Sequence, residues 1–254
     1  MPSGSFACST FNVMTNKKKA SSNPYFEMPQ IGNSAPKFTA ETTRGEINFP
    51  DDYQGKWVLF FSHPADFTPV CTSEFMAAAS MYDQFAAANC ALVGLSCDTI
   101  RSHVEWLQRI KDNVEYKGMK NVEVKFPLVA DWRKEVASLY GMIQPNENEV
   151  HAVRAVFIID PDGVVRLMSY YPNNIGRNMD ELYRALIAMQ TAKNFDVYIP
   201  ANWQPGDDVI DPSASAKAAR DQENKIPKGT TDHDWFFWTK KLSKRRVLKA
   251  IETL

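Results

Sequence analysis

Residues 57–79 read WVLFFSHPADFTPVCTSEFMAAA, and this stretch indicates the fold class most directly. Its first five residues are all apolar, which predicts a strand buried on both faces. A polar loop follows, and apolar residues then recur at the spacing of one helix face. These residues are Phe75, Ala78, Ala79, Tyr82, Phe85 and Ala86. A buried strand that leads through a loop into a helix indicates an α/β domain.

The same alternation continues along the chain. In chain order, the next expected elements are strand 91–95, a helix opened by a capping box of Ser102 and Glu105, strand 126–130, and a helix capped by Asp131 and ended by Gly141. Strands 153–159 and 164–170 follow, joined by the turn 160–163, and a helix opened by Asn178 and Glu181 comes last. Strands and helices in this order support the α/β assignment.

The composition changes at both ends of the α/β pattern. Residues 1–24 are polar and without period, which predicts a mobile tail. Beyond residue 193, prolines punctuate an irregular segment that holds an Ala-rich stretch, 213–223, and an aromatic cluster, 235–238. We therefore expect one domain over 25–193 and a smaller unit over 194–254. The smaller unit is near the lower size limit for a self-sufficient core, so we expect it to lean on the first domain or on another subunit.

The charge distribution narrows the function classes. The 254 residues carry a net charge of −1, but residues 1–26 hold three lysines and no acid, and residues 239–254 hold six basic residues and one acid. The body between them is therefore acidic, which excludes the basic surface of a nucleic-acid-binding protein. No apolar run approaches the ~18 residues of a membrane span. We expect neither nucleic-acid binding nor membrane insertion.

The basic ends bear on localisation. We expect a cytoplasmic protein, with an organellar or nuclear address left open. The segment 240–246 resembles a nuclear-localisation signal, although a solvated helix face explains its charges as well, and we favour that interpretation.

The four cysteines are Cys8, Cys71, Cys90 and Cys97, and no two of them form a C-x-x-C pair. This spacing argues against a zinc ribbon and against a dithiol redox pair. We expect no metal site and no cofactor.

Cys71 stands out by its position. Thr68-Pro69 is a helix-start signal, with Thr68 as N-cap and Pro69 as the first helical residue. Cys71 then falls in the first turn, where free N–H groups and the helix dipole favour a thiolate. A thiol of pKa ~8.5 is about 3% ionised at pH 7, and one of pKa ~6 is about 90% ionised. Because that gain is only about thirtyfold, a fast reaction also needs a fixed cation and a hydroxyl beside the sulfur.

The segment 62–72, SHPADFTPVCT, resembles the active-site segment of peroxiredoxins, whose signature is Pro-x-x-x-Thr/Ser-x-x-Cys. Here the signature residues are Pro64, Thr68 and Cys71, and the segment is most similar to the one-Cys class. The resemblance continues in VGLSCDTIRSHVEW (93–106), HAVRAVFIIDPDGVVR (151–166), YYPNNIGRNMDEL (170–182) and DWFFW (234–238).

The resemblance implies a thioredoxin-like fold with a smaller C-terminal extension that helps to form homodimers and often larger rings. It implies that Cys71 attacks the peroxide and becomes a sulfenic acid. Arg154 would stabilise the thiolate and polarise the peroxide. The other implied roles are a hydrogen bond from Thr68 to the peroxide, shielding of the cysteine by Pro64, donation from the N–H groups of Val70 and Cys71, a place near the sulfur for His63, and support of the site by Glu74 and Arg177.

The chain departs from two-Cys peroxiredoxins because no cysteine follows Cys97. This departure predicts a one-Cys cycle, in which an external thiol or another reductant regenerates Cys71. We interpret Cys90 and Cys97 as structural, and nothing supports a role for Cys8. A peroxide sensor or an oligomeric holdase chaperone is the alternative function, because the same cysteine serves a sensor.

Overall fold

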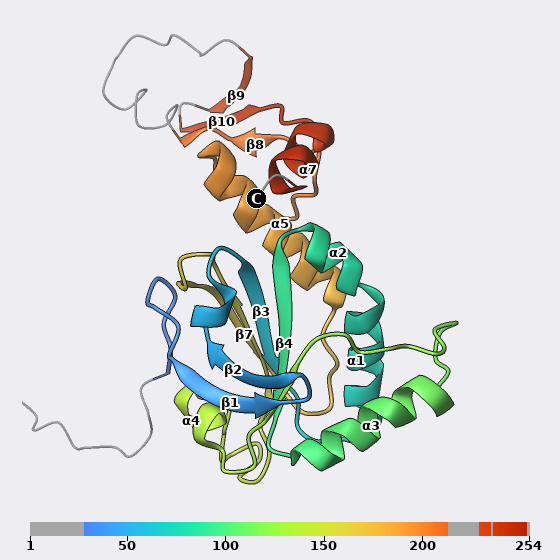
Figure 1. Cartoon of the computed structure of the whole chain (residues 1–254). Helices are drawn as coiled ribbons and strands as arrows, with labels where there is room; N and C mark the ends of the chain where they lie inside the picture. The colour runs from blue at the N-terminus through green and yellow to red at the C-terminus, as the bar shows by residue number, and fades with distance from the viewer. Residues whose placement is uncertain (1–27, 213–228, 235, 253–254) are drawn as a thin grey trace, which may run out of the picture.

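The computed structural model describes residues 28–212, 229–234 and 236–252. The expected tail, the Ala-rich stretch 213–223 and Trp235 lie outside these ranges. Within them the chain forms a seven-stranded and a three-stranded sheet, joined by one long helix (Figure 1).

The larger sheet has the strand order β2-β1-β5-β4-β3-β6-β7. Its strands are β1 (Phe38–Thr42), β2 (Gly45–Phe49), β3 (Trp57–Ser62), β4 (Cys90–Ser96), β5 (Leu128–Ala130), β6 (Arg154–Ile159) and β7 (Val165–Tyr171). β3, β4 and β5 run parallel, and β6 lies antiparallel beside β3. The expected strands are therefore present, with small shifts at their ends.

Apolar side chains on both faces of β3 explain its position in the interior of the sheet, between β4 and β6. Trp57, Leu59 and Phe61 join one hydrophobic cluster, and Val58 and Phe60 join another. The first cluster is covered by α1 (Pro69–Ser80), α2 (Tyr82–Ala87), α3 (Ile100–Asn113) and α5 (Met179–Phe195). The second is covered by α4 (Glu135–Leu139), which Figure 1 shows on the other side of the sheet.

Helix starts and stops differ from expectation in three places. The helical stripe over 75–86 is interrupted at Met81, which separates α1 from α2. α3 begins earlier than predicted, because Thr99 rather than Ser102 is the N-cap and accepts the N–H of Ser102. Asp131 does cap α4, but from four residues away: its carboxylate accepts the N–H groups of residues 135–137.

The last predicted cap is confirmed in part. Asn178 accepts the N–H of Glu181 at the start of α5. The side chain of Glu181 bonds Arg184 at 2.6 and 2.7 Å, so the pair does not form a reciprocal capping box. A short 3₁₀ turn, η1 (Asp51–Tyr53), follows β2.

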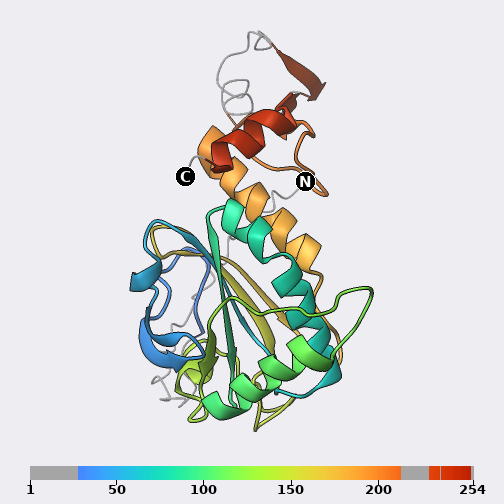
Figure 2. The same ribbon diagram turned by 45° about the vertical axis from the view of Figure 1, so that its right-hand side comes forward.

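The C-terminal unit contains the small sheet, in the order β8-β10-β9, and the helix α7 (Lys244–Glu252). Its strands are β8 (Val209–Ile210), β9 (Thr230–Asp234) and β10 (Phe237–Lys240). Both views show α5 reaching from the larger sheet to this unit (Figures 1 and 2). The boundary expected near residue 193 falls in the last turn of α5, and the division into domains stays a prediction.

α7 places the basic C-terminal segment on a helix. Val247 and Ile251 are buried, while Lys244, Arg245 and Arg246 are exposed. The helix therefore packs its apolar side against the protein and leaves its charges in solvent. Among the described residues, no helix is long and apolar enough to cross a membrane.

Candidate active site

The predicted site residues meet where β3 ends and β6 begins. Because β3 and β6 are antiparallel neighbours, the carboxyl end of one lies beside the amino end of the other. Cys71 comes from the helix that follows β3, and Arg154 is the first residue of β6. The Nη1 atom of Arg154 lies 3.3 Å from the Cys71 sulfur. Two residues 83 positions apart in sequence are thus in direct contact.

Cys71 occupies the third position of α1, as predicted, and is completely buried. Thr68 is the N-cap residue, and the first backbone bond of the helix runs from the N–H of Thr72 to the carbonyl of Thr68. The N–H groups of Val70 and Cys71 precede that bond, so they have no acceptor inside the helix. They are donors that face the start of α1, beside the thiol.

The Arg154 guanidinium is fixed from three sides. Nη1 donates to Glu74 Oε2 at 2.5 Å, in addition to its contact with the sulfur. Nε and Nη2 both donate to the backbone carbonyl of Asn173, at 3.1 and 2.8 Å. Arg154 is 2% exposed, so these partners replace the water it would otherwise bind. The cation that the reaction requires is therefore held in one orientation.

Glu74 connects Arg154 to a second buried arginine. Its two carboxylate oxygens accept Nε and Nη2 of Arg177, each at 2.8 Å, and Oε1 also accepts the Arg177 N–H. Burial alone raises the pKa of Glu74, but the charges of Arg177 and Arg154 outweigh it and hold the pKa below its ordinary value. Glu74 is therefore an anion between two cations.

The charges of this cluster leave one positive charge beside the Cys71 sulfur. Arg154 and Arg177 contribute two positive charges, and Glu74 contributes one negative charge. Because all three side chains are buried, the excess positive charge is poorly screened by water. A thiolate at Cys71 neutralises it through the contact with Arg154.

Thr68 differs from its predicted role as a side-chain cap. Its hydroxyl donates to the carbonyl of Ala65 at 2.9 Å, and no N–H of the helix bonds to it. The hydroxyl oxygen therefore keeps its lone pairs available on a half-buried side chain. Pro64, in the same loop, is buried, as its shielding role requires.

His63 is buried with its ring stacked on Trp106, at a centroid distance of 5.0 Å, and set edge-on to Phe75 at 4.8 Å. Its Nε2 atom lies 3.0 Å from the carboxylate of Asp66. Neither ring nitrogen hydrogen bonds the Cys71 sulfur in the part of the chain that the structure describes. The structure thus brings His63 into the wall of the site, with Asp66 as its partner.

Sequence reasoning missed three residues of the site. Ser62 is fully buried, and its hydroxyl donates to the carbonyl of Val153 and accepts the N–H of Ala155, on either side of Arg154. Asn173 acts through its main-chain carbonyl, for which no sequence signal exists. His103, on α3, is buried and bonds Asp66 at 2.8 Å.

The other described cysteines lack this environment. Cys90 is buried at the start of β4, and burial raises the pKa of its thiol. Burial and the charge of Asp131 raise the pKa of Cys97 to about 11. Both are free thiols. Cys8 lies outside the described residues.

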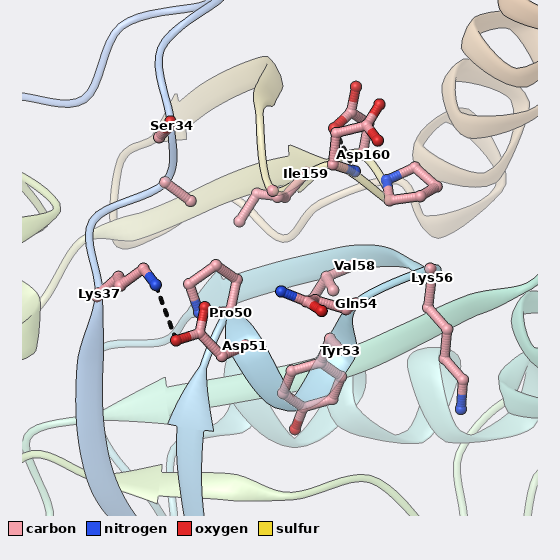
Figure 3. A pocket seen from close by; sticks show the side chains of 15 residues that line it. Ser34, Lys37, Pro50, Asp51, Tyr53, Gln54, Lys56, Val58, Ile159 and Asp160 are labelled. Carbon is pink, nitrogen blue, oxygen red and sulfur yellow. Dashed lines mark hydrogen bonds and ion pairs between the residues drawn. The ribbon is translucent and has the colours of Figure 1, made fainter.

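Two cavities of the described chain differ in their position relative to the site. One, of about 530 Å³, lies at the opposite end of β3 and β6, where Val58, Tyr53 and Ile159 line it (Figure 3). None of the predicted site residues lines that cavity. A second, of about 580 Å³, borders the site because Thr68 and Val70 form part of its wall.

Potential metal ligands also occur beside the site. His63, Asp66 and Asp98 place ligand atoms within 4.8 Å of one another. His63 bonds the Asp66 carboxylate, and Asp98 accepts the Asp66 N–H, at 3.0 Å in each case. We interpret this group as a hydrogen-bonded network.

Comparisons with known proteins agree with the site. Residues 31–168 match the model of the AhpC/TSA family, and residues 188–225 match the C-terminal domain of 1-Cys peroxiredoxin. A peroxiredoxin of Methanosarcina mazei is 54% identical over 215 residues, which cover 84% of this chain and 98% of the relative. A peroxiredoxin of Thermotoga maritima is 43% identical over 221 residues, covering 85% and 98%.

Solved structures extend the likeness. A yeast mitochondrial 1-Cys peroxiredoxin superposes with a TM-score of 0.72 at 38% identity, covering 85% of this chain and 100% of the other. A cysteine-to-serine mutant of the Peroxiredoxin 6 of Arenicola marina superposes with a TM-score of 0.70 at 32% identity, covering 84% and 98%.

The family matches place the chain among thiol-dependent peroxidases, and a buried thiol on the helix that follows β3, in contact with an arginine, is compatible with that class. The chain belongs to the AhpC/TSA family and is a peroxiredoxin of the one-Cys class. The expected fold, with its C-terminal extension, is confirmed.

Proposed function

We propose that Cys71 is the peroxidatic cysteine and that it reduces hydrogen peroxide and organic hydroperoxides. The observation that carries this assignment is the 3.3 Å contact between its sulfur and Arg154 Nη1. Cys71 is the one described cysteine that combines a helix start with a fixed cation. Reactive cysteines are found in such electropositive surroundings.

The proposed first step is attack of the Cys71 thiolate on one peroxide oxygen. The S–O bond forms as the O–O bond breaks, and the departing oxygen leaves with the bonding electron pair and takes up the peroxide proton. The sulfur is oxidised to a sulfenate, which takes a proton from solvent to become the sulfenic acid, and the peroxide is reduced to water or an alcohol. Arg154 and the N–H groups of Val70 and Cys71 stabilise the charge that develops on the departing oxygen.

The second proposed step uses an external thiol. One thiol attacks the sulfenic sulfur and releases water, and a second thiol then frees Cys71 as a disulfide of the reductant forms. The raised pKa values of Cys90 and Cys97 support this assignment, because thiols that stay protonated are poor resolving nucleophiles. The yeast relative is resolved through the glutathione/thioredoxin systems, which supports a small thiol or a thioredoxin as reductant.

A rapid-mixing peroxide assay of Cys71→Ser tests the assignment. We expect the fast phase of peroxide consumption to disappear, because a hydroxyl is a far weaker nucleophile than a thiolate. Cys90→Ser is the matched control, since it changes a buried thiol away from the arginine cluster. Retention of the fast phase in Cys71→Ser would refute the assignment.

The cycle and the alternative roles are separated by stoichiometry. Many peroxides consumed per subunit with added dithiothreitol indicate an enzyme, whereas one indicates a sensor. Mass spectrometry after one equivalent of peroxide tests the one-Cys cycle, because a disulfide from Cys71 to another cysteine in most molecules contradicts it.

A homodimer, or a larger ring built from it, remains a prediction. Light scattering on the eluted protein measures the mass directly.

A further inference from the structure

Two histidines share one carboxylate beside the site. Asp66 Oδ1 lies 3.0 Å from His63 Nε2, and Asp66 Oδ2 lies 2.8 Å from His103 Nδ1. The far nitrogen of His103, Nε2, lies 3.1 Å from the carbonyl oxygen of Val129. His63 and His103 are 0% exposed, and Asp66 is 6% exposed. The three side chains form a buried row from β5 to the active-site loop.

The acceptors in this row determine where the protons are. A carbonyl oxygen only accepts, so Nε2 of His103 carries a proton. Burial on its own raises the pKa of Asp66, but hydrogen bonds from His103 and His63 outweigh it and lower the pKa below its usual range. An ionised Asp66 accepts from both rings. Each ring nitrogen of His103 thus faces an acceptor oxygen, which fixes the orientation of the ring between Asp66 and the Val129 carbonyl.

His63 is left with one free nitrogen. Burial, as the largest effect, lowers its pKa, and the charge of His103 lowers it further, against Asp66 and Asp98, which raise it. His63 is therefore neutral, and its single proton lies on Nε2 because that atom donates to Asp66. Nδ1 is buried and has no hydrogen-bond partner among the described residues. A buried acceptor without a partner is costly and rare in native structures, unless a ligand supplies the donor.

We propose that Asp66 and His103 are positioning residues of the peroxidase, which hold His63 as the Nε2–H tautomer and keep the Nδ1 lone pair free to accept a proton or hydrogen bond during turnover. A hydroperoxide carries an O–H donor, which is the kind of partner that the Nδ1 lone pair accepts. The inference rests on the proposed function for its role in turnover. The assignment of the protons rests on the network alone.

Nitrogen-15 NMR of the histidine rings in the reduced, full-length wild type tests that assignment without any measure of activity. We expect a pyridine-like Nδ1 and a protonated Nε2 for His63, and a protonated Nε2 for His103, which faces the Val129 carbonyl. A His63 that carries its proton on Nδ1 would overturn the proposal, whatever the peroxidase rate.

His103→Gln tests the effect on the reaction. Removal of the His103 ring raises the pKa of His63, because His103 opposes its protonation. We expect His63 to titrate at higher pH and the acid side of the peroxidase pH profile to move to higher pH with it. His233→Gln is the matched control, since His233 is exposed in the C-terminal unit and bonds Thr239. A profile of His103→Gln that matches the control would reduce His103 to a packing residue.

Asp66→Asn and Asp66→Ala provide a rescue test. The Asn amide can accept from His63 through oxygen and donate to His103 through nitrogen, so the His63 tautomer is retained. Ala leaves both rings without a partner. We expect Asn to keep at least about tenfold more of the rate than Ala, as expected for general acid–base groups. Equal rates in two folded variants contradict the proposal, while loss of the fast phase in Cys71→Ser shows that the proposed function itself still holds.

Discussion

A buried carboxylate lies at each end of the β3–β6 pair, and the two are used differently. Glu74, at the end that holds Cys71, binds two buried guanidiniums. Asp160, at the other end, is 1% exposed and accepts the N–H groups of Asp162 and Val164 in the turn between β6 and β7. Its cationic partners, Arg166 at 2.7 Å and Lys193 at 3.8 Å, have side chains that are 42% and 46% exposed.

The comparison shows that a buried charge alone does not mark a reactive site. Asp160 is satisfied by the turn that it shapes and by two cations in contact with solvent. The second cation, Lys193, also pairs with Asp162, so the surroundings of Asp160 carry no excess charge. Glu74 leaves one positive charge uncompensated, and a nucleophile lies within reach of it. The functional end is the one where the protein leaves a positive charge unbalanced, so that a negatively charged reacting group can balance it.

Among the substitutions that compare the two ends, Arg154→Ala is expected to have the largest effect on rate. Loss of the donor that faces the departing oxygen removes about 3 kcal/mol of transition-state stabilisation, which is about a hundredfold in rate. The measurement is the second-order rate of peroxide consumption across neutral and mildly alkaline pH. Arg166→Ala, which removes an arginine at the other end, is the control. A near-normal rate in Arg154→Ala would mean that the two ends do not differ as described.

Glu74→Gln is expected to lower the rate by about tenfold, because Arg154 loses its ion pair with the carboxylate. It is also expected to lower the free energy of unfolding by about 3–5 kcal/mol. The pKa of Glu74 is lowered in the folded protein, so its contribution to stability is present above the ordinary carboxyl pKa and is lost as the pH falls below it. Urea unfolding should therefore show a wild-type advantage at neutral pH that shrinks as the solution is acidified. A constant difference over that range would contradict the ionised state of Glu74.

Ser62→Ala is expected to slow the reaction by a few-fold only. Its hydroxyl joins β3 to the residues that flank Arg154, and its removal leaves a buried N–H without an acceptor, which costs about 1–3 kcal/mol. Stopped-flow rates and urea midpoints measure the two effects. Ser80→Ala, which removes an exposed hydroxyl from α1, should change neither.

Asp160→Asn is expected to leave the rate unchanged within error. It weakens the β6–β7 turn and the contact with Arg166, so the free energy of unfolding should fall by about 1–3 kcal/mol. The same two assays apply. A rate loss that approaches that of Glu74→Gln would remove the distinction between the two ends.

The parts of the fold that can be predicted well from the sequence are those decided by burial. The apolar runs of β3, β4 and β6 can be buried on both faces only as interior strands of a sheet. The position of Cys71 in the first turn of α1 follows from the helix-start signal at Thr68 and Pro69. The start of α3 differs from the prediction because Thr99 and Ser102 are both good caps, and the choice depends on where the chain leaves β4. Local sequence does not contain that information.

The site shows the same division. Cys71 and Arg154 carry a side-chain signature, and the structure brings them together. The carbonyl of Asn173 that orients Arg154 has no signature, since any residue supplies one. His103 resembles a core residue in sequence because the carboxylate that it bonds lies 37 positions away.

α5 connects the region of the arginine cluster to the C-terminal unit. The helix begins shortly after Arg177, spans 17 residues and therefore extends about 25 Å, and its last residue, Phe195, contacts Arg246 of α7. Arg184, in its second turn, donates to the carbonyl of Trp203 at 3.1 Å in the C-terminal unit. The helix α5 thus begins beside the arginine cluster and contacts the C-terminal unit along its length and at its C-terminal end. A displacement of the cluster large enough to carry Arg177 with it tilts the extension as well.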